Sequence, residues 1–137
     1  MLDSAEIKNT AQKQTNLDFF GNPLFLEGFE SLVYSINKEA DLNDVGLEAQ
    51  KYRLIGVLAN LLRIEEACIQ TPEILDEEIK SPVVIVGLPR TGSTMTHRLL
   101  ASDPRHTAML WWEGRYPAML NGEVRGNPEE RMEMGKA

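Results

Sequence analysis

Apolar residues recur at helical spacing along two stretches of the first half of the chain. The first stretch predicts an amphipathic helix over about residues 23–39, and its apolar positions are Phe25, Phe29, Leu32, Val33 and Ile36. After a polar break at residues 41–44, the second stretch predicts a longer helix over 47–70, with Leu54, Leu58, Leu61, Leu62 and Ile64 on its apolar side. Residues 1–16 are polar and predict a loose lead-in or a short helix.

The pattern changes after residue 81. Residues 83–86 are continuously apolar and β-branched, as in a strand that is covered on both faces of a parallel sheet. A helix is predicted from Ser93 to about Ser102, and Asp103-Pro104 ends it. The apolar run 107–112 is short enough for a second strand. Strand, helix and strand at this spacing predict a βαβ unit with parallel pairing.

The predicted fold class is therefore α/β, the start of a P-loop-like parallel sheet core preceded by a helical N-terminal region. We place the boundary between the two domains at residue 80, with residues 1–80 helical and 81–137 forming an incomplete α/β domain. Two strands are too few for an independent sheet, which usually needs three or more. The chain is therefore expected to be the N-terminal part of a larger enzyme or a truncated reading frame. A further helix is predicted to start near Pro128.

The segment between the first predicted strand and its helix has the features of a phosphate-binding loop. Gly87 and Gly92 allow tight turns and a close approach of the backbone to a ligand. The helix that follows directs free N–H groups and its positive dipole end at the loop. A nucleotide-binding P-loop reads G-x-x-x-x-G-K-[ST], whereas this chain reads G-L-P-R-T-G-S-T. Ser93 replaces the lysine and the cation is Arg90, so a phosphate ligand other than ordinary ATP or GTP is indicated.

The stretch G-L-P-R-T-G-S-T-M-T-H-R-L-L-A-S-D-P-R, followed by W-W-E-G-R-Y-P, closely resembles bacterial sulfotransferases. It is similar to their 5′-phosphosulfate-binding region, from about residue 82 to residue 117. The resemblance implies 3′-phosphoadenosine 5′-phosphosulfate as the sulfuryl donor. It places donor binding on the loop residues Pro89, Arg90, Thr91, Gly92, Ser93 and Thr94. It also implies a 3′-phosphate motif further along, and this chain has no recognisable counterpart.

Two residues are expected to act in catalysis. Arg90 would neutralise charge on the transferring sulfuryl group and on the leaving phosphate. Glu113 follows Trp111-Trp112, where several branches of the resembled family carry a glutamate that acts as the general base toward the acceptor. The carboxyl ends of parallel strands face one crevice, so Glu113 is expected within about 10 Å of the loop. The plainer interpretations are a surface arginine and a solvated loop glutamate.

Other residues have simpler interpretations. Ser93 and Thr94 would hydrogen-bond phosphate, but they also suit an N-cap. His97 is more simply a surface or packing residue, and His106 a loop residue. Trp111 and Trp112 would line an acceptor pocket or pack in the core. Cys68 is the only cysteine and is expected to be a small buried hydrophobe.

Charge and composition narrow the function classes. The net charge is −7 and no basic stripe is present, which argues against nucleic-acid binding. Arg90, Arg98 and Arg105 surround the single acid Asp103, which suits an anion site. The N-terminus lacks the features of a signal peptide and no apolar run could span a membrane, so a cytoplasmic location is expected. No metal site is predicted.

The function predicted from the sequence is a sulfotransferase that moves a sulfuryl group from the phosphosulfate donor to a hydroxyl or amine on a small-molecule acceptor. Two alternatives stay open at this point. One is a P-loop kinase or nucleotide hydrolase, and the other is a non-catalytic helical fragment that binds a partner. The acceptor and the oligomeric state are not defined by the sequence.

Overall fold

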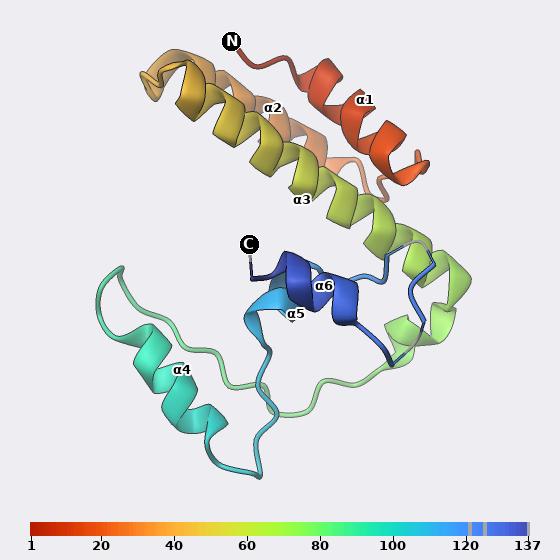
Figure 1. The fold of residues 1–137 in the computed structure, drawn as a ribbon, viewed down its shortest axis with the longest axis vertical. Coiled ribbons are helices and arrows are strands. Elements are labelled where there is room, and N and C mark those ends of the chain that lie inside the picture. Colours follow the sequence, from red (N-terminus) through yellow and green to blue (C-terminus); the bar gives the residue numbers. More distant parts are fainter. Residues whose placement is uncertain (121, 125, 137) are drawn as a thin grey trace.

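A computed structural model of the chain describes residues 1–120, 122–124 and 126–136 (Figure 1). Its elements are the helices α1 (Ser4–Thr15), α2 (Leu24–Glu39), α3 (Asp44–Gln70), the 3-10 turn η1 (Pro72–Asp76), and the helices α4 (Ser93–Ala101), α5 (Trp111–Arg115) and α6 (Glu129–Met134). Within the described residues no β-strand is formed. The parallel sheet that the sequence predicted is therefore not present in this structure.

The core lies among α1, α2 and α3, which run beside one another (Figure 1). Both long helices predicted from the apolar spacing are confirmed, although α3 begins at Asp44 because the Asn43 side chain accepts the Gly46 N–H at 2.8 Å. Phe29 and Val33 of α2 meet the buried face of α3, which consists of Leu54, Ile55, Leu58, Ala59 and Leu62.

The lead-in forms a regular helix and closes the core on one side. Asp3 caps α1 by accepting the N–H groups of Ala5 and Glu6 at 2.8 and 3.3 Å. Ile7 and Ala11, one turn apart, are fully buried. The Asn37 side chain of α2 accepts the Leu2 N–H at 2.7 Å and donates to the Leu2 carbonyl at 2.9 Å, so the start of the chain is fixed to α2.

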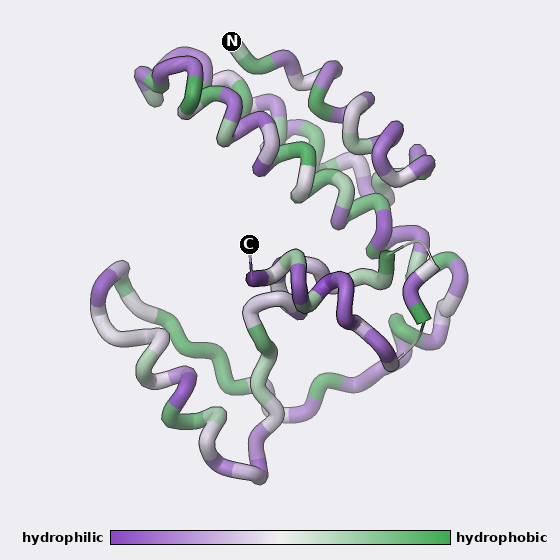
Figure 2. The backbone as a smooth tube through the Cα atoms, in the orientation of Figure 1, coloured by the Kyte–Doolittle hydropathy of each residue, from purple (hydrophilic) through white to green (hydrophobic). Residues whose placement is uncertain are grey.

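The prediction of a strand over residues 83–86 is wrong for this structure. The segment contains no strand, and Val83, Val84 and Val86 are 68%, 76% and 89% exposed. Figure 2 shows this hydrophobic stretch in the long arm that leads from η1 to α4. An isolated strand is not stable, because its N–H and C=O groups need a neighbouring strand, and none is present among the described residues.

The second predicted strand, residues 107–112, is wrong as well. Its last two residues belong to α5, which begins at Trp111. The Glu113 carboxylate accepts the Leu110 N–H at 2.6 Å, and this contact favours a helix start at that point. The predicted helix near Pro128 is confirmed as α6, which packs against α5.

In the part of the chain that the structure describes, no helix combines the length and the apolar character that crossing a membrane requires. The predicted domain boundary at residue 80 lies in the extended segment after η1. That boundary and the cytoplasmic location stay predictions.

Candidate phosphate-binding loop and the Glu113 pocket

The loop of residues 87–92 has a conformation that specifically needs glycine at its first position. The Thr91 hydroxyl donates to the Leu88 carbonyl at 2.6 Å and closes the turn. A Cβ atom added at Gly87 would lie only 2.8 Å from the Thr91 Oγ1. The Thr91 side chain therefore holds the loop in shape, and its proton is used within the protein.

Two loop residues adopt left-handed backbone conformations. Gly92 has φ +88° and Arg90 has φ +68°. This region is rare for a residue with a side chain and occurs mostly where function or a tight turn requires it. Alternation of left- and right-handed residues turns successive N–H groups toward one side, which makes a concave anion site.

The helix behind the loop leaves its first N–H groups available. Gly92 is the N-cap of α4, it contributes no side-chain cap, and its carbonyl accepts the Thr96 N–H at 3.0 Å. In the described chain the side chains of Ser93 and Thr94 make no hydrogen bond. With nine residues, α4 is long enough for its free N–H groups and its dipole to favour an anion at this end.

Charge around the loop is provided by Arg90 and not by the whole predicted arginine cluster. Arg90 is exposed and pairs with no acidic side chain of the described residues. Arg105, in contrast, holds both carboxylate oxygens of Asp103, with Nη2 to Oδ2 at 2.6 Å. The hydrogen bonds from the Arg105 side chain lower the pKa of Asp103 below its ordinary value, and the bond from the Arg105 N–H contributes less. Arg105 is thus neutralised locally.

These observations give a loop that suits a phosphate or sulfate group. The donors are the first N–H groups of α4, the hydroxyls of Ser93 and Thr94, and the guanidinium of Arg90. Pro89 and Gly92 shape the backbone, while Thr91 fixes the turn. Among the described residues no cluster of His, Cys, Asp and Glu has the arrangement of a metal site.

Glu113 lies in a separate pocket of about 540 Å³ between the start of α5 and α6. The pocket is lined by Thr107, Ala108, Met109, Trp112, Glu113, Pro117 and Arg131. One carboxylate oxygen of Glu113, Oε2, accepts the Leu110 N–H, and the other has no bond to a described residue. Glu113 is therefore held in place while its second carboxylate oxygen is open to a further hydrogen bond.

Arg131 organises this pocket, and the sequence analysis did not identify it. Its Nε donates to both oxygens of Glu123 at 2.9 and 2.8 Å, its Nη1 donates to the Tyr116 carbonyl at 2.9 Å, and its guanidinium lies 5.2 Å from the centre of the Trp112 ring. The side chains of Arg131 and Glu123 are 12% and 4% exposed, so this is a nearly buried ion pair. In the sequence, the signal for the role of Arg131 was limited to a tryptophan and an arginine that lie nineteen positions apart.

The structure does not bring the loop and Glu113 into one pocket. No residue of 87–94 lines the Glu113 pocket, and α4 packs against no other helix of the described chain (Figure 1). The separation expected between Glu113 and the loop was derived from two adjacent strands, which are absent here. The joint site stays a prediction.

The two predicted histidines have surroundings that fit the simpler interpretations, whereas neither Trp111 nor Trp112 belongs to the hydrophobic core. His97 is exposed on α4, and the His106 Nδ1 lies 3.3 Å from the Leu100 carbonyl at the end of that helix. Trp111 is 75% exposed. Trp112 is half-buried against Arg131, and its indole N–H is buried without a hydrogen-bond partner in the described structure.

Comparison with known proteins identifies a relationship for this loop and its surroundings. Residues 82–135 match the model of the "Sulfotransferase family". The structure is similar to the crystal structure of sulfotransferase STF1 from Mycobacterium tuberculosis H37Rv, with a TM-score of 0.79 and 35% sequence identity. That alignment covers 85% of this chain and 32% of STF1, so the chain spans about a third of the length of that protein. The sequence has no significant match among curated proteins.

Proposed function

We propose that this chain, which is related to the sulfotransferase family, binds 3′-phosphoadenosine 5′-phosphosulfate and takes part in transferring its sulfuryl group to a hydroxyl or amine acceptor. The observation that carries the proposal is the geometry of residues 87–94. A glycine-dependent turn, left-handed conformations at Arg90 and Gly92, and an uncapped helix start lie together, and the Arg90 side chain has no ion-pair partner among the described residues. The acceptor is proposed to be a small molecule.

The loop would hold the phosphosulfate end of the donor. Backbone N–H groups at the start of α4 are fixed in position before the ligand arrives, so they need no reorganisation during the reaction. Ser93 and Thr94 would add hydroxyl donors. Arg90 would balance the charge that develops on the leaving phosphate, and its planar guanidinium can donate to two oxygens at once.

Glu113 is proposed as the general base. In the transfer, the acceptor oxygen forms a bond to sulfur while the bond from sulfur to the bridging phosphate oxygen breaks. The acceptor proton would pass to the free oxygen of the Glu113 carboxylate, and the other oxygen would keep its bond to the Leu110 N–H. Transfer requires the loop and the Glu113 pocket to face one crevice.

Titration calorimetry with the full chain tests the donor assignment. Adenosine 3′,5′-bisphosphate, ADP and GTP with Mg²⁺ are compared as ligands, and we expect the bisphosphate to bind best. Arg90→Ala should weaken binding of the phosphosulfate donor by about 10- to 100-fold, the value of a hydrogen bond to a charged group. Arg98→Ala, on the same arm but in the last turn of α4, is the matched control and should bind normally.

Two results would contradict the proposal. Preferential binding of GTP with Mg²⁺ would favour a nucleotide-hydrolysing enzyme. Equal donor affinity of the wild type and the Arg90→Ala variant would remove the loop from the site.

A further inference from the structure

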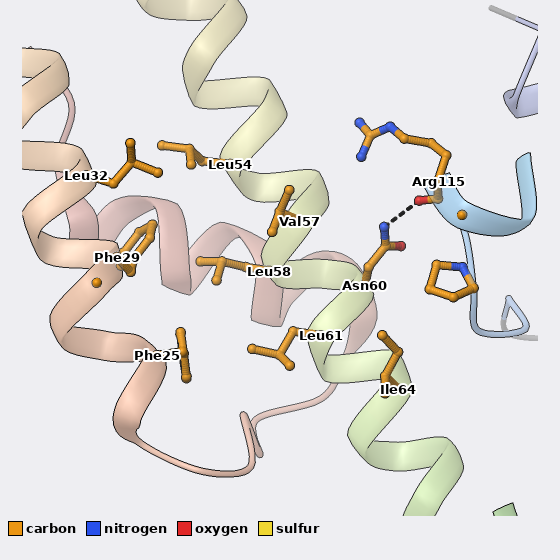
Figure 3. A pocket seen from close by; sticks show the side chains of 13 residues that line it. Phe25, Phe29, Leu32, Leu54, Val57, Leu58, Asn60, Leu61, Ile64 and Arg115 are labelled. Atoms are coloured by element: carbon orange, nitrogen blue, oxygen red, sulfur yellow. Dashed lines mark hydrogen bonds between the residues drawn. The ribbon is translucent and has the colours of Figure 1, made fainter. Parts of the chain in front are cut away.

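A groove lies along α2 and α3, and Gly114 and Arg115 of α5 also line it (Figure 3). Its volume is about 520 Å³, within the range of roughly 300–1,000 Å³ that is typical for small-molecule sites. Leu32, Val57 and Ile64 line it and are 47%, 51% and 37% exposed. These side chains therefore form a continuous apolar lining that the described protein leaves open to a ligand.

Gly28 is a lining residue of this groove. It lies inside α2, where a glycine is less favourable than an alanine. A Cβ atom added there would meet no atom within 4 Å. No close packing within the described protein explains the glycine, whereas a ligand that lies along α2 would use the space.

One end of the groove is polar. There the Asn60 side chain donates to the Arg115 carbonyl at 2.7 Å, as the dashed line in Figure 3 marks. The Arg115 guanidinium lies against Gly56 and 5.4 Å from the centre of the Tyr116 ring. Within the described residues it forms no ion pair. An apolar channel that ends at an unpaired cation suits an amphiphile, a molecule with a long apolar chain and a polar end.

The polar end also adjoins the Glu113 pocket. Pro117 lines both cavities, and α5 contributes Gly114 and Arg115 to the groove but Trp112 and Glu113 to the other pocket. A molecule whose chain lies along α2 and α3 would thus place its polar end at the helix that carries the candidate base.

From this arrangement we infer that the groove binds the apolar chain of the acceptor, and that the acceptor is a long-chain alcohol. The inference rests on the proposed function, because it assigns the substrate class of the same reaction. The apolar chain supplies affinity through burial, and the hydroxyl end is directed past Pro117 toward Glu113.

Amide chemical shifts of the isotope-labelled full chain test the groove, with hexanol, octanol and decanol as probes. Decanol should shift the amides of Gly28, Leu32 and Val57, and glycerol should not. Each added methylene should strengthen binding by about fourfold, as expected for burial of one CH₂ group. Shifts confined to other regions, or affinities independent of chain length, would overturn the inference.

Filling the groove gives a sharper test. Gly28→Leu should weaken decanol binding by about tenfold or more while the melting temperature stays equal or rises, since leucine favours a helix. Leu32→Gln is the second variant, and its half-exposed position tolerates a polar side chain. Gly28→Ala is the control and should bind decanol almost normally. Undiminished binding in both Gly28→Leu and Leu32→Gln would overturn the inference.

The same variants separate this inference from the proposed function. Gly28→Leu should bind adenosine 3′,5′-bisphosphate as the wild type does, and Arg90→Ala should keep decanol binding. If the wild type does not bind adenosine 3′,5′-bisphosphate, the donor assignment is contradicted and the acceptor assignment is unaffected. A second copy of the chain could close the groove instead, and the protein would then form a concentration-dependent dimer that decanol does not dissociate. That result would overturn the acceptor assignment and leave the donor assignment unaffected.

Discussion

The Asn60 side chain donates to the carbonyl oxygen of Arg115 at 2.7 Å and joins α3 to α5 across 55 positions of sequence. This bond links the helical core to the helix that carries the candidate base. It also fixes the boundary between the apolar groove and the Glu113 pocket, because Gly114, Arg115 and Pro117 lie at that boundary.

Asn60→Ala should loosen α5 without unfolding the core. Loss of one hydrogen bond costs about 1 kcal/mol, which corresponds to roughly fivefold faster exchange of the protected amides of Gly114 and Tyr116. Hydrogen exchange measured by NMR checks this. Asn37→Ala removes a comparable side-chain amide that instead binds Leu2, so it should leave exchange in α5 unchanged. Equal exchange rates in Asn60→Ala and wild type would show that the bond does not hold α5.

The ion pair of Glu123 with Arg131 should matter far more than the exposed ion pairs. Glu123→Ala leaves a nearly buried guanidinium without its partner, which costs on the order of 3–5 kcal/mol. The double variant Glu123→Leu with Arg131→Met removes both charges and should lose much less. Denaturant unfolding followed by fluorescence of Trp112, in a Trp111→Phe background, checks the difference. Similar losses in the single and double variants would contradict this account.

The same ion pair predicts a pH dependence. Burial opposes ionisation of Glu123, but the hydrogen bonds from Arg131 and from the Leu120 N–H outweigh it, so its pKa is lowered. A lowered pKa in the folded protein gives stability that is present above the ordinary glutamate value of about 4.3 and is lost as the pH falls through the folded pKa. The Trp112 environment should therefore be constant near neutral pH and change only in acid. A transition near pH 6 or 7 would contradict this assignment.

Two substitutions of Glu113 separate its two roles. In Glu113→Gln the amide oxygen can still accept the Leu110 N–H, so α5 should start normally while the base is lost. In Glu113→Ala both the base and the cap are lost, and the cap alone is worth about 1 kcal/mol. Where transfer is assayed, both variants should lower kcat by about 10²- to 10⁴-fold, and only alanine should change the helix content or melting temperature. A glutamine variant that retains most of its turnover would exclude Glu113 as the base.

The sequence predicted those elements that are stabilised by their own pattern. The bounds of α2 and α4 were predicted to within one residue, because a repeated apolar face defines α2 locally and the glycine loop and Asp103-Pro104 bracket α4. The helix α1 was underestimated, since its buried positions Ile7 and Ala11 make only a narrow stripe that a short polar segment easily hides. Its caps at Asp3 and Asn16 were the available signal.

The strands failed for a different physical reason. A strand depends on partners that the sequence of the strand does not contain, and residues 83–86 have none among the described residues. For residues 107–112 the apolar run suggested one element, but the Glu113 side chain reaching back to Leu110 starts a helix within it. The loop was predicted correctly in its glycines and helix start, whereas the links made by Asn60 and Arg131 join distant segments and left no local pattern.

The central claim is that residues 87–94 bind the phosphosulfate end of the donor. The most direct measurement is a titration of the isotope-labelled chain with adenosine 5′-phosphosulfate, followed at the amides of Gly92, Ser93, Thr94 and Met95. The account predicts saturable shifts at these four amides that persist in Arg98→Ala and are strongly weakened in Arg90→Ala. Shifts that are absent from the start of α4, or that are the same in Arg90→Ala as in the wild type, would contradict it.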